Sequence, residues 1–319
     1  MIKTMKSFMC SLNVLAFILI LFPSTIYAKD SLFDITYGAN LFVAAGSQET
    51  CDVDGPCTYV AILAASPDGI NWIETNLPTD MSFILTDVTY VNNLFVACGF
   101  NCTILTSPDG ITWTAATVSG CSTERINGIT YGNNIFVGLA NWGGFVMSLD
   151  GIDWASWVYD RNYYFHDIAY GKNNFTAVGV VGKNGVALTS PDGMTWKETM
   201  IHYNCRGITY GKDMFVAVGK SGTIVSSSDG KDWNLKKSGT KQDLSSVLYG
   251  NNMFVAVGES GTIVTSSDGN KWSVRNPGTA HIYLFSIAYG NGLFVAIGSN
   301  DTIMTSPDGI TWTIREINS

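Results

Sequence analysis

The chain has 319 residues, with 18 Lys and Arg against 26 Asp and Glu and a formal net charge of −8. An acidic chain of which only 14% is charged lacks the basic surface that nucleic-acid binding requires, so we expect no nucleic-acid partner. Its hydrophobic content of 46% is sufficient for a large packed core.

The first 28 residues have the composition of a secretory signal peptide. Lys3 and Lys6 precede an apolar stretch over 12–22, and Ala28 ends a segment that suits cleavage by signal peptidase. The apolar stretch is too short to span a bilayer and no second one follows, so we expect no transmembrane anchor. The sequence therefore predicts a signal peptide over 1–28 and one exported domain, periplasmic or extracellular, over 29–319.

The motif Ser-x-Asp-Gly-x-x-Trp recurs seven times in the exported region, at intervals of 37–42 residues. The copies open at Ser66, Ser107, Ser148, Ser190, Ser227, Ser266 and Ser306. A period near 40 residues with short apolar runs is typical of β-propeller blades. Because seven units account for the whole of 29–319, the sequence leaves no room for a second domain.

Each repeat unit contains four short strand patterns separated by turn residues. In the fifth unit they cover 207–210, 214–218, 223–226 and 232–235, which predicts an antiparallel four-stranded meander. We therefore expect an all-β fold, a seven-bladed β-propeller of four-stranded antiparallel blades. The region starts with an inner-strand pattern and ends with an outer-strand pattern, so the ring should close without an exchanged strand. The innermost strands should carry Ile35, Ile129, Ile208 and Ile287.

The repeated motif resembles the Asp-box of sialidases and related propellers, in a form that lacks the residue between Asp and Gly. With the Tyr-Gly-Asn-Asn and Phe-Val-Ala-Val-Gly runs, the chain is similar to bacterial repeat propellers grouped with the photosystem II stability and assembly factor. That resemblance implies an exported scaffold that binds other proteins, and it carries no catalytic residue over to this chain. It also implies that the seven motif aspartates staple turns at the blade periphery.

Six cysteines remain after cleavage of the signal peptide, an even number that indicates disulfides in an exported protein. Cys51 and Cys57 flank a short loop, as do Cys98 and Cys102, and we expect both pairs to be bonded. The pairing of Cys121 and Cys205 stays open.

The connections between blades differ most from one repeat to the next. Alternating strand direction places the second-to-third-strand loops and the connections between blades on one face, where we expect partner binding. The candidate binding residues are Arg125, Trp142, Trp157, Arg161, Tyr163, Tyr164, His166 and Arg206. They combine aromatic rings with arginine, as binding hot spots do. In the alternative interpretation, Trp157, Tyr159 and Phe165 fill the channel or pack between blades three and four.

Metal and cofactor sites are not expected. The three histidines, His166, His202 and His281, come from different blades without ligand spacing, so we expect solvated loop residues. Residues 52–55 lack the length and the distal glutamate of a calcium loop, which favours a polar turn.

The sequence favours a non-enzymatic, monomeric scaffold that binds a protein or glycan in the cell envelope or outside the cell. A structural envelope-assembly protein without a single ligand remains open. The alternative function is a sialidase-like glycoside hydrolase, which would need three convergent arginines. Only five arginines follow the signal peptide, so we expect no enzymatic activity and assign no catalytic residue.

Overall fold

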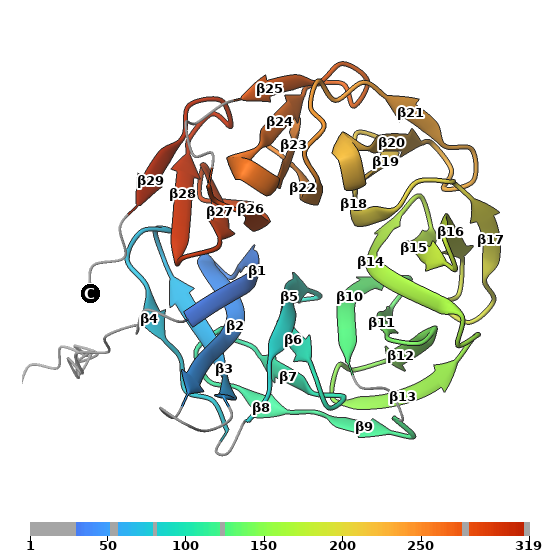
Figure 1. The fold of residues 1–319 in the computed structure, drawn as a ribbon. Helices are drawn as coiled ribbons and strands as arrows, with labels where there is room; N and C mark the ends of the chain where they lie inside the picture. The colour runs from blue at the N-terminus through green and yellow to red at the C-terminus, as the bar shows by residue number, and fades with distance from the viewer. Residues whose placement is uncertain (1–29, 52–56, 79–81, 122–124, 276–280, 316–319) are drawn as a thin grey trace, which may run out of the picture.

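A computed structural model describes residues 30–51, 57–78, 82–121, 125–275 and 281–315. It confirms the expected seven-bladed β-propeller, with the blades arranged around a central channel (Figure 1). The predicted signal peptide over 1–28 lies outside the described residues. The innermost strands are β1 (Asp30–Gly38), β5 (Leu85–Val91), β10 (Ile126–Gly132), β14 (Tyr163–Gly171), β18 (Cys205–Gly211), β22 (Leu244–Gly250) and β26 (Leu284–Gly290).

Each inner strand continues outward into its own blade, so the blades coincide with the sequence repeats. The second strands are β2 (Leu41–Cys51), β6 (Leu94–Gly99), β11 (Ile135–Ala140), β15 (Asn174–Val181), β19 (Met214–Gly219), β23 (Met253–Gly258) and β27 (Leu293–Gly298). The third are β3 (Cys57–Ser66), β7 (Ile104–Ser107), β12 (Gly144–Ser148), β16 (Asn184–Ser190), β20 (Ile224–Ser227), β24 (Ile263–Ser266) and β28 (Thr302–Ser306). The outer are β4 (Ile73–Glu74), β8 (Thr114–Ala115), β13 (Asp153–Val158), β17 (Lys197–Met200), β21 (Asn234–Lys236), β25 (Ser273–Arg275) and β29 (Thr313–Arg315).

The expected closure without an exchanged strand is confirmed, because β1–β4 form the first blade and β26–β29 the last. Ile35, Ile129, Ile208 and Ile287 all lie on innermost strands, as predicted. Two three-residue 3₁₀ turns, η1 (Lys220–Gly222) and η2 (Glu259–Gly261), connect the second and third strands of blades five and six. Across the described ranges, the chain has no helix long and apolar enough to cross a bilayer.

The core consists of seven clusters, one at each contact between neighbouring blades. The second strand of every blade supplies a fully buried phenylalanine: Phe42, Phe95, Phe136, Phe175, Phe215, Phe254 and Phe294. Each packs against the inner-strand tyrosine of its own blade, with ring centroids 4.4–4.8 Å apart. A single blade would expose these apolar faces, so the ring is the smallest unit that can bury them.

The Tyr-Gly pair at the end of the inner strand explains why the repeat needs glycine there. The tyrosine ring of one blade lies directly against the glycine of the preceding blade, as Tyr249 lies against Gly211. A Cβ atom at Gly211 would overlap that ring. The same contact between Gly290 and Tyr37 joins the last blade to the first and closes the ring.

The Ser-x-Asp-Gly turn is held by its own side chains. In the fifth blade, Asp229 accepts hydrogen bonds from the backbone N–H of Lys231 (2.9 Å) and the hydroxyl of Ser227 (3.0 Å). At Asp192, hydrogen bonds from the backbone N–H groups of Thr195 and Met194 lower the carboxyl pKa to about 2. These aspartates are committed to turn geometry, on the outer part of the blades away from the channel.

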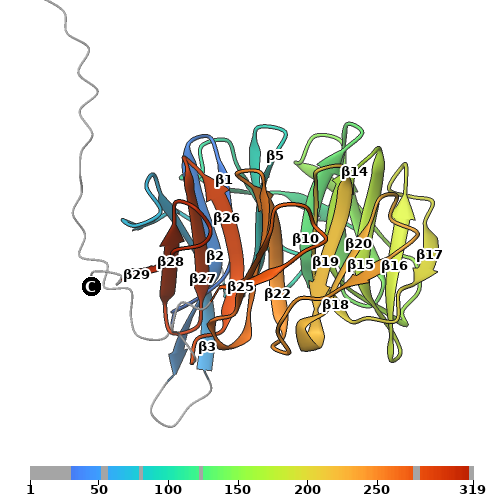
Figure 2. The same cartoon turned by 90° about the horizontal axis from the view of Figure 1, so that it is seen from above.

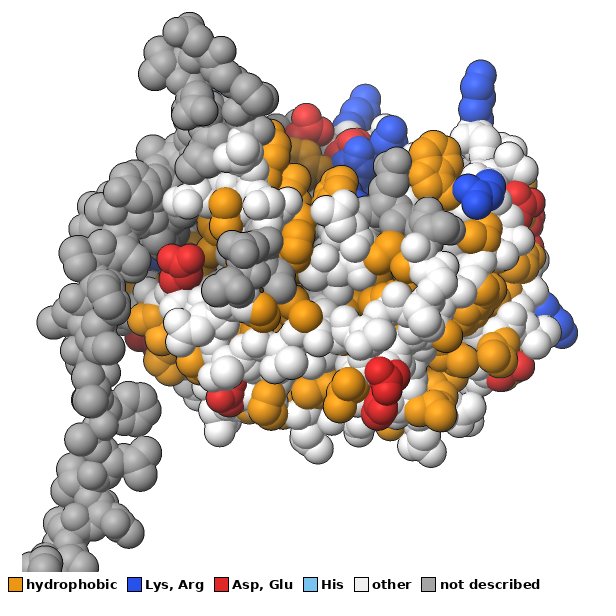
Figure 3. All heavy atoms as spheres, turned by 90° about the horizontal axis from the view of Figure 1, so that it is seen from below, with side chains coloured by type: hydrophobic (Ala, Val, Ile, Leu, Met, Phe, Trp, Pro, Cys, Tyr) orange, Lys and Arg blue, Asp and Glu red, His pale blue; other side chains and the backbone are white. Residues whose placement is uncertain are grey.

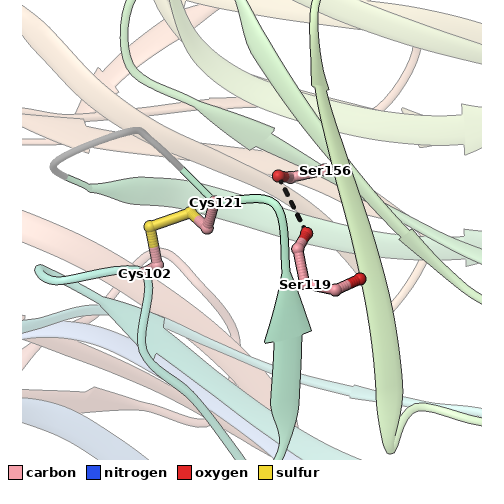
Figure 4. The surroundings of a disulfide bond; sticks show 4 residues. All are labelled: Cys102, Ser119, Cys121 and Ser156. Carbon is pink, nitrogen blue, oxygen red and sulfur yellow. Dashed lines mark hydrogen bonds between the residues drawn. A yellow bond between two sulfur atoms is a disulfide. The ribbon is translucent and has the colours of Figure 1, made fainter.

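Blade three departs from the four-stranded pattern. The connection from blade two contributes β9 (Thr117–Ser119), which pairs in parallel with β13 as a fifth strand. Ser119 reinforces this pairing, since its hydroxyl donates to the carbonyl of Trp154. Its own carbonyl accepts a hydrogen bond from the Ser156 hydroxyl (Figure 4).

The predicted disulfide between Cys98 and Cys102 is wrong. Cys102 is bonded to Cys121, with Cα atoms 6.2 Å apart (Figure 4). Cys98 is buried at the contact between blades two and three, while Cys102 sits in the following turn and faces the connection that carries Cys121. Cys205 is a free, buried thiol in the core between blades four and five.

The β2–β3 hairpin of blade one is longer than the others and projects beyond the disc (Figure 2). Cys51 and Cys57 lie opposite each other at its end in the strand ladder. Their side chains and residues 52–56 are outside the described set, so the Cys51–Cys57 bond and the polar turn stay predictions.

Replacing Cys121 with Ser should lower the free energy of unfolding by about 3 kcal/mol, because the bond closes a loop of 19 residues in the unfolded chain. Chemical denaturation of the oxidised protein would measure this loss. Peptide mapping without reduction should recover Cys102 linked to Cys121, and a Cys98–Cys102 peptide would contradict the structure.

Candidate binding site at the channel mouth

The inner strands line the channel, and all seven carry the same backbone irregularity. Every inner strand has a β-bulge before its central Ile or Val, seen as a register shift against the second strand. The bulged residues are Phe33, Thr86, Asn127, His166, Arg206, Ser245 and Phe285, and we call them the bulge ring. A bulge leaves a residue out of the ladder and redirects its side chain. These seven positions therefore tolerate very different side chains on one scaffold.

The residue after the bulge forms a second, deeper layer. Asp34, Asp87 and Asp167 occupy this position in blades one, two and four, and line a channel cavity of about 450 Å³. We call them the carboxyl layer. Each aspartate accepts a hydrogen bond from the backbone of the next inner strand along the chain. Asp34 accepts from Val88 N (2.8 Å), Asp87 from Ile129 N (3.3 Å) and Asp167 from Ile208 N (2.8 Å).

The carboxyl layer holds its protons unusually strongly. Burial raises the pKa of Asp167 to about 7. Burial and the negative charges of Asp34 and Asp167 raise the pKa of Asp87 well above its ordinary value. Burial also raises the pKa of Asp34.

Cationic groups lie above the carboxyl layer, on blades three to five. Arg206 spans the mouth, donating to the Tyr283 hydroxyl (2.7 Å) and forming an ion pair with Asp243 (3.0 Å). Arg125 precedes β10, with its guanidinium carbon 5.5 Å from the centroid of the Phe100 ring. Burial and the positive charges of Arg206 and Arg125 lower the pKa of His166 to about 4, so this imidazole is neutral at pH 7.

The opposite side of the mouth is aromatic. Phe33, Phe100, Tyr283 and Phe285 line a second cavity of about 470 Å³ together with Ile84 and Arg125. The mouth thus joins an aromatic wall to a cationic side, above three carboxyls whose pKa values are raised. Viewed along the edge of the disc, Figure 3 shows most visible Lys and Arg side chains gathered on the rim where the β2–β3 hairpin projects.

The predicted site residues fall into three environments. Arg125, His166 and Arg206 meet at the channel mouth. Trp142 and Tyr164, 41% and 37% exposed, form a surface pair with ring centroids 4.7 Å apart, and Arg161 is exposed on the nearby connection. Tyr163, by contrast, is core, and Trp157 packs against this core.

The burial of Tyr163 corrects its prediction as a contact residue. Its ring lies 5.6 Å from that of Phe165, its exposure is 8%, and its hydroxyl donates to Glu198 of β17. Phe165 is fully buried and Trp157 stacks on Phe145, so these rings pack between blades three and four. This agrees with the alternative interpretation for Trp157 and Phe165, whereas Tyr159 is 41% exposed.

His166 also differs from its prediction, because it lies on β14 in the channel and not in a solvated loop. His202 and His281 are exposed. Within the described part of the chain, no three His, Cys, Asp or Glu side chains are arranged to hold a metal ion.

Sequence reasoning missed the carboxyl layer and the aromatic wall. The sequence does contain a signal for the carboxyl layer, because Asp34, Asp87 and Asp167 each directly precede the central Ile or Val of their inner strand. Alignment of the seven inner strands would have shown two adjacent positions that vary while their neighbours repeat. Those two positions are the bulge ring and the layer beneath it.

Replacing Asp87 with Asn should stabilise the fold at alkaline pH. The native state holds protons that the unfolded chain releases near pH 4, so wild-type stability falls as pH rises above that value. The amide introduced by Asp87→Asn is uncharged at every pH, so the variant avoids the cost of ionising this buried position. The difference in melting temperature between the variant and wild type should be near zero at pH 5 and positive at pH 8.5.

The exposed turn residue Asp213 supplies the control, since Asp213→Asn should show no such pH-dependent difference. A melting-temperature difference for Asp87→Asn that is constant from pH 5 to 8.5 would contradict a raised pKa at Asp87.

Comparisons with known proteins agree with the fold. A family model described as the DUF6242 beta propeller domain matches residues 204–319, blades five to seven. No curated protein matches the chain. Three solved structures are similar over most of their length. YCF48 bound to D1 peptide has a TM-score of 0.68 at 15% identity, covering 92% of this chain and 95% of that one.

The second structure is a catalytically inactive virginiamycin B lyase from Staphylococcus aureus with quinupristin, with a TM-score of 0.68 at 13% identity, covering 88% and 96%. The third is the WD40 beta propeller domain of Doa1, with a TM-score of 0.62 at 16% identity, covering 90% and 93%. At these identities the likeness shows the fold, a β-propeller scaffold shared by binding proteins and by enzymes.

Proposed function

We propose that the protein is an exported, non-enzymatic scaffold that binds a protein partner through the face bearing the channel mouth. One observation carries this proposal. The residues that depart from the repeat, Trp142, Tyr164, Arg161 and the bulge ring, gather on one face, while the Asp-Gly turns of the other face remain uniform. Exposed aromatic rings beside arginine are the usual hot spots of protein recognition.

Export is supported by the signal-peptide composition of 1–28 and by the Cys102–Cys121 disulfide, which requires an oxidising compartment to persist. Protein binding is supported by the fold shared with YCF48, which has been solved with a D1 peptide. A glycan partner fits the same exposed rings less well, because the planes of Trp142 and Tyr164 are inclined by 60° and form no flat platform.

The arginine positions argue against the sialidase-like alternative. Arg125 and Arg206 lie at the channel mouth, but Arg161 is on the outer surface of its connection. Arg275 and Arg315 lie on outer strands, where each donates to a threonine hydroxyl of its own blade, Thr265 and Thr305. The five arginines therefore do not converge on one carboxylate site.

Photo-crosslinking in the producing cells would test the proposal. A benzophenone amino acid at position 142 or 164 should give a discrete protein adduct, because both side chains are exposed at the proposed face. The same probe at Met194, 60% exposed on the uniform face, is the matched control. Trp142→Ala with Tyr164→Ala should weaken partner binding at least tenfold, at about 2 kcal/mol for a hot-spot residue, with little change in melting temperature.

Equal adducts at positions 164 and 194 would refute the assignment of the face. Recovery of the protein with residues 1–28 still attached, in the cytoplasmic fraction, would refute export. Tyr163→Ala should instead lower the melting temperature, since that ring is core.

A further inference from the structure

The aromatic cavity at the channel mouth adjoins the channel cavity, with which it shares Phe33, Thr86, Arg125, Ser245 and Phe285, and it has one charged lining residue. We call it the vestibule; its wall consists of Phe33, Ile84, Phe100, Tyr283 and Phe285, with Arg125 at one side. The rings of Phe33 and Phe285 lie 5.8 Å apart, and those of Tyr283 and Phe285 lie 5.3 Å apart. Its volume of about 470 Å³ lies in the range of small-molecule sites.

Most polar groups of the vestibule are already used within the protein. Thr86 donates to the carbonyl of Ile126 (2.9 Å), and Ser245 donates to that of Leu284 (2.5 Å). The Tyr283 hydroxyl accepts from Arg206.

Arg125 is different. Its Nε is buried and has no hydrogen-bond partner in the part of the chain that the structure describes. Burial also lowers the pKa of this guanidinium, because no carboxylate compensates fully for lost water. A buried donor left without an acceptor costs free energy that an anionic ligand would recover.

We propose that the vestibule binds a carboxylate attached to an aromatic or branched apolar group, with the carboxylate on Arg125 and the apolar group against Phe33, Tyr283 and Phe285. Guanidinium–carboxylate hydrogen bonds are among the strongest available to a protein. A free aromatic acid and the C-terminal aromatic residue of a peptide share this chemistry. The inference does not rest on the Trp142–Tyr164 surface, because neither residue lines the vestibule.

The charges around the vestibule favour an anion over a cation. Arg206 is already paired with Asp243, so Arg125 is the lining cation with an unused donor. The carboxyl layer lies one position deeper than the bulge ring, and Asp167 with its pKa of about 7 is half-protonated at neutral pH. The carboxyl layer therefore repels an incoming carboxylate less strongly than three fully ionised aspartates would.

Isothermal titration with 3-phenylpropionate and its neutral amide, 3-phenylpropanamide, tests the proposal. The wild-type protein should bind the acid saturably, and Arg125→Gln should weaken that binding about tenfold or more. The amide should bind more weakly and equally to both proteins. Arg275→Gln is the matched control, since Arg275 lies on an outer strand and should leave acid binding unchanged.

The aromatic wall is tested by Phe285→Ser. The repeat already places serine, Ser245, at the same bulge position of blade six, so this substitution is compatible with the fold. It should weaken acid binding about fivefold to tenfold, as expected for loss of an aromatic contact, with a cooperative melt retained.

Two tripeptides ending in Phe, one with a free C-terminus and one amidated, distinguish the sources of the carboxylate. Tighter binding of the free-acid peptide than of 3-phenylpropionate assigns a peptide end, and the reverse assigns a free small acid. Equal affinity of wild type and Arg125→Gln for 3-phenylpropionate, or no saturable binding of either acid, would overturn the proposal. Loss of crosslinks at position 164 would leave it intact.

Discussion

The packing of each inner-strand tyrosine on the glycine of the preceding blade is the contact on which the rest of the structure depends. It sets the spacing between blades, and the contact of Gly290 with Tyr37 joins the two ends of the propeller. Blade two is the exception, because Val91 replaces glycine and packs in the same cluster as Tyr131. Six constrained contacts out of seven are therefore enough to hold the ring closed.

This constraint separates positions that must repeat from positions that are free. The tyrosines, the glycines and the buried phenylalanines face neighbouring blades, so any change there alters a packed surface. The bulge residues face the channel and leave the strand ladder, so they touch neighbouring blades through single contacts, such as the hydrogen bond from Thr86 to the carbonyl of Ile126, and not through the packed core. Phe33, His166 and Arg206 can thus occupy equivalent positions in one ring, and the channel mouth acquires an aromatic and a cationic side without loss of closure.

The sequence predicted the blade count, the strand order and the closure, because all three follow from a repeat whose period is visible without side-chain geometry. The site was predicted only in part. Trp142 and Tyr164 meet on the surface as exposed residues, but Tyr163, one position away, is core, and strand alternation decides between them. The Cys102–Cys121 bond was missed because it joins a turn to the segment just after β9, a strand with no counterpart in the other repeats.

The aspartates of the carboxyl layer connect neighbouring blades, but only some blades have them. Asp34, Asp87 and Asp167 each bridge to the next inner strand, so they stabilise the contacts between blades one and two, two and three, and four and five. A serine or glycine occupies the same position in blades three, five, six and seven, where the ring closes equally well. Closure therefore does not require these carboxyls. Burial raises the pKa of all three carboxyls and four blades lack one, so the channel, and not the repeated turns, is the candidate functional site.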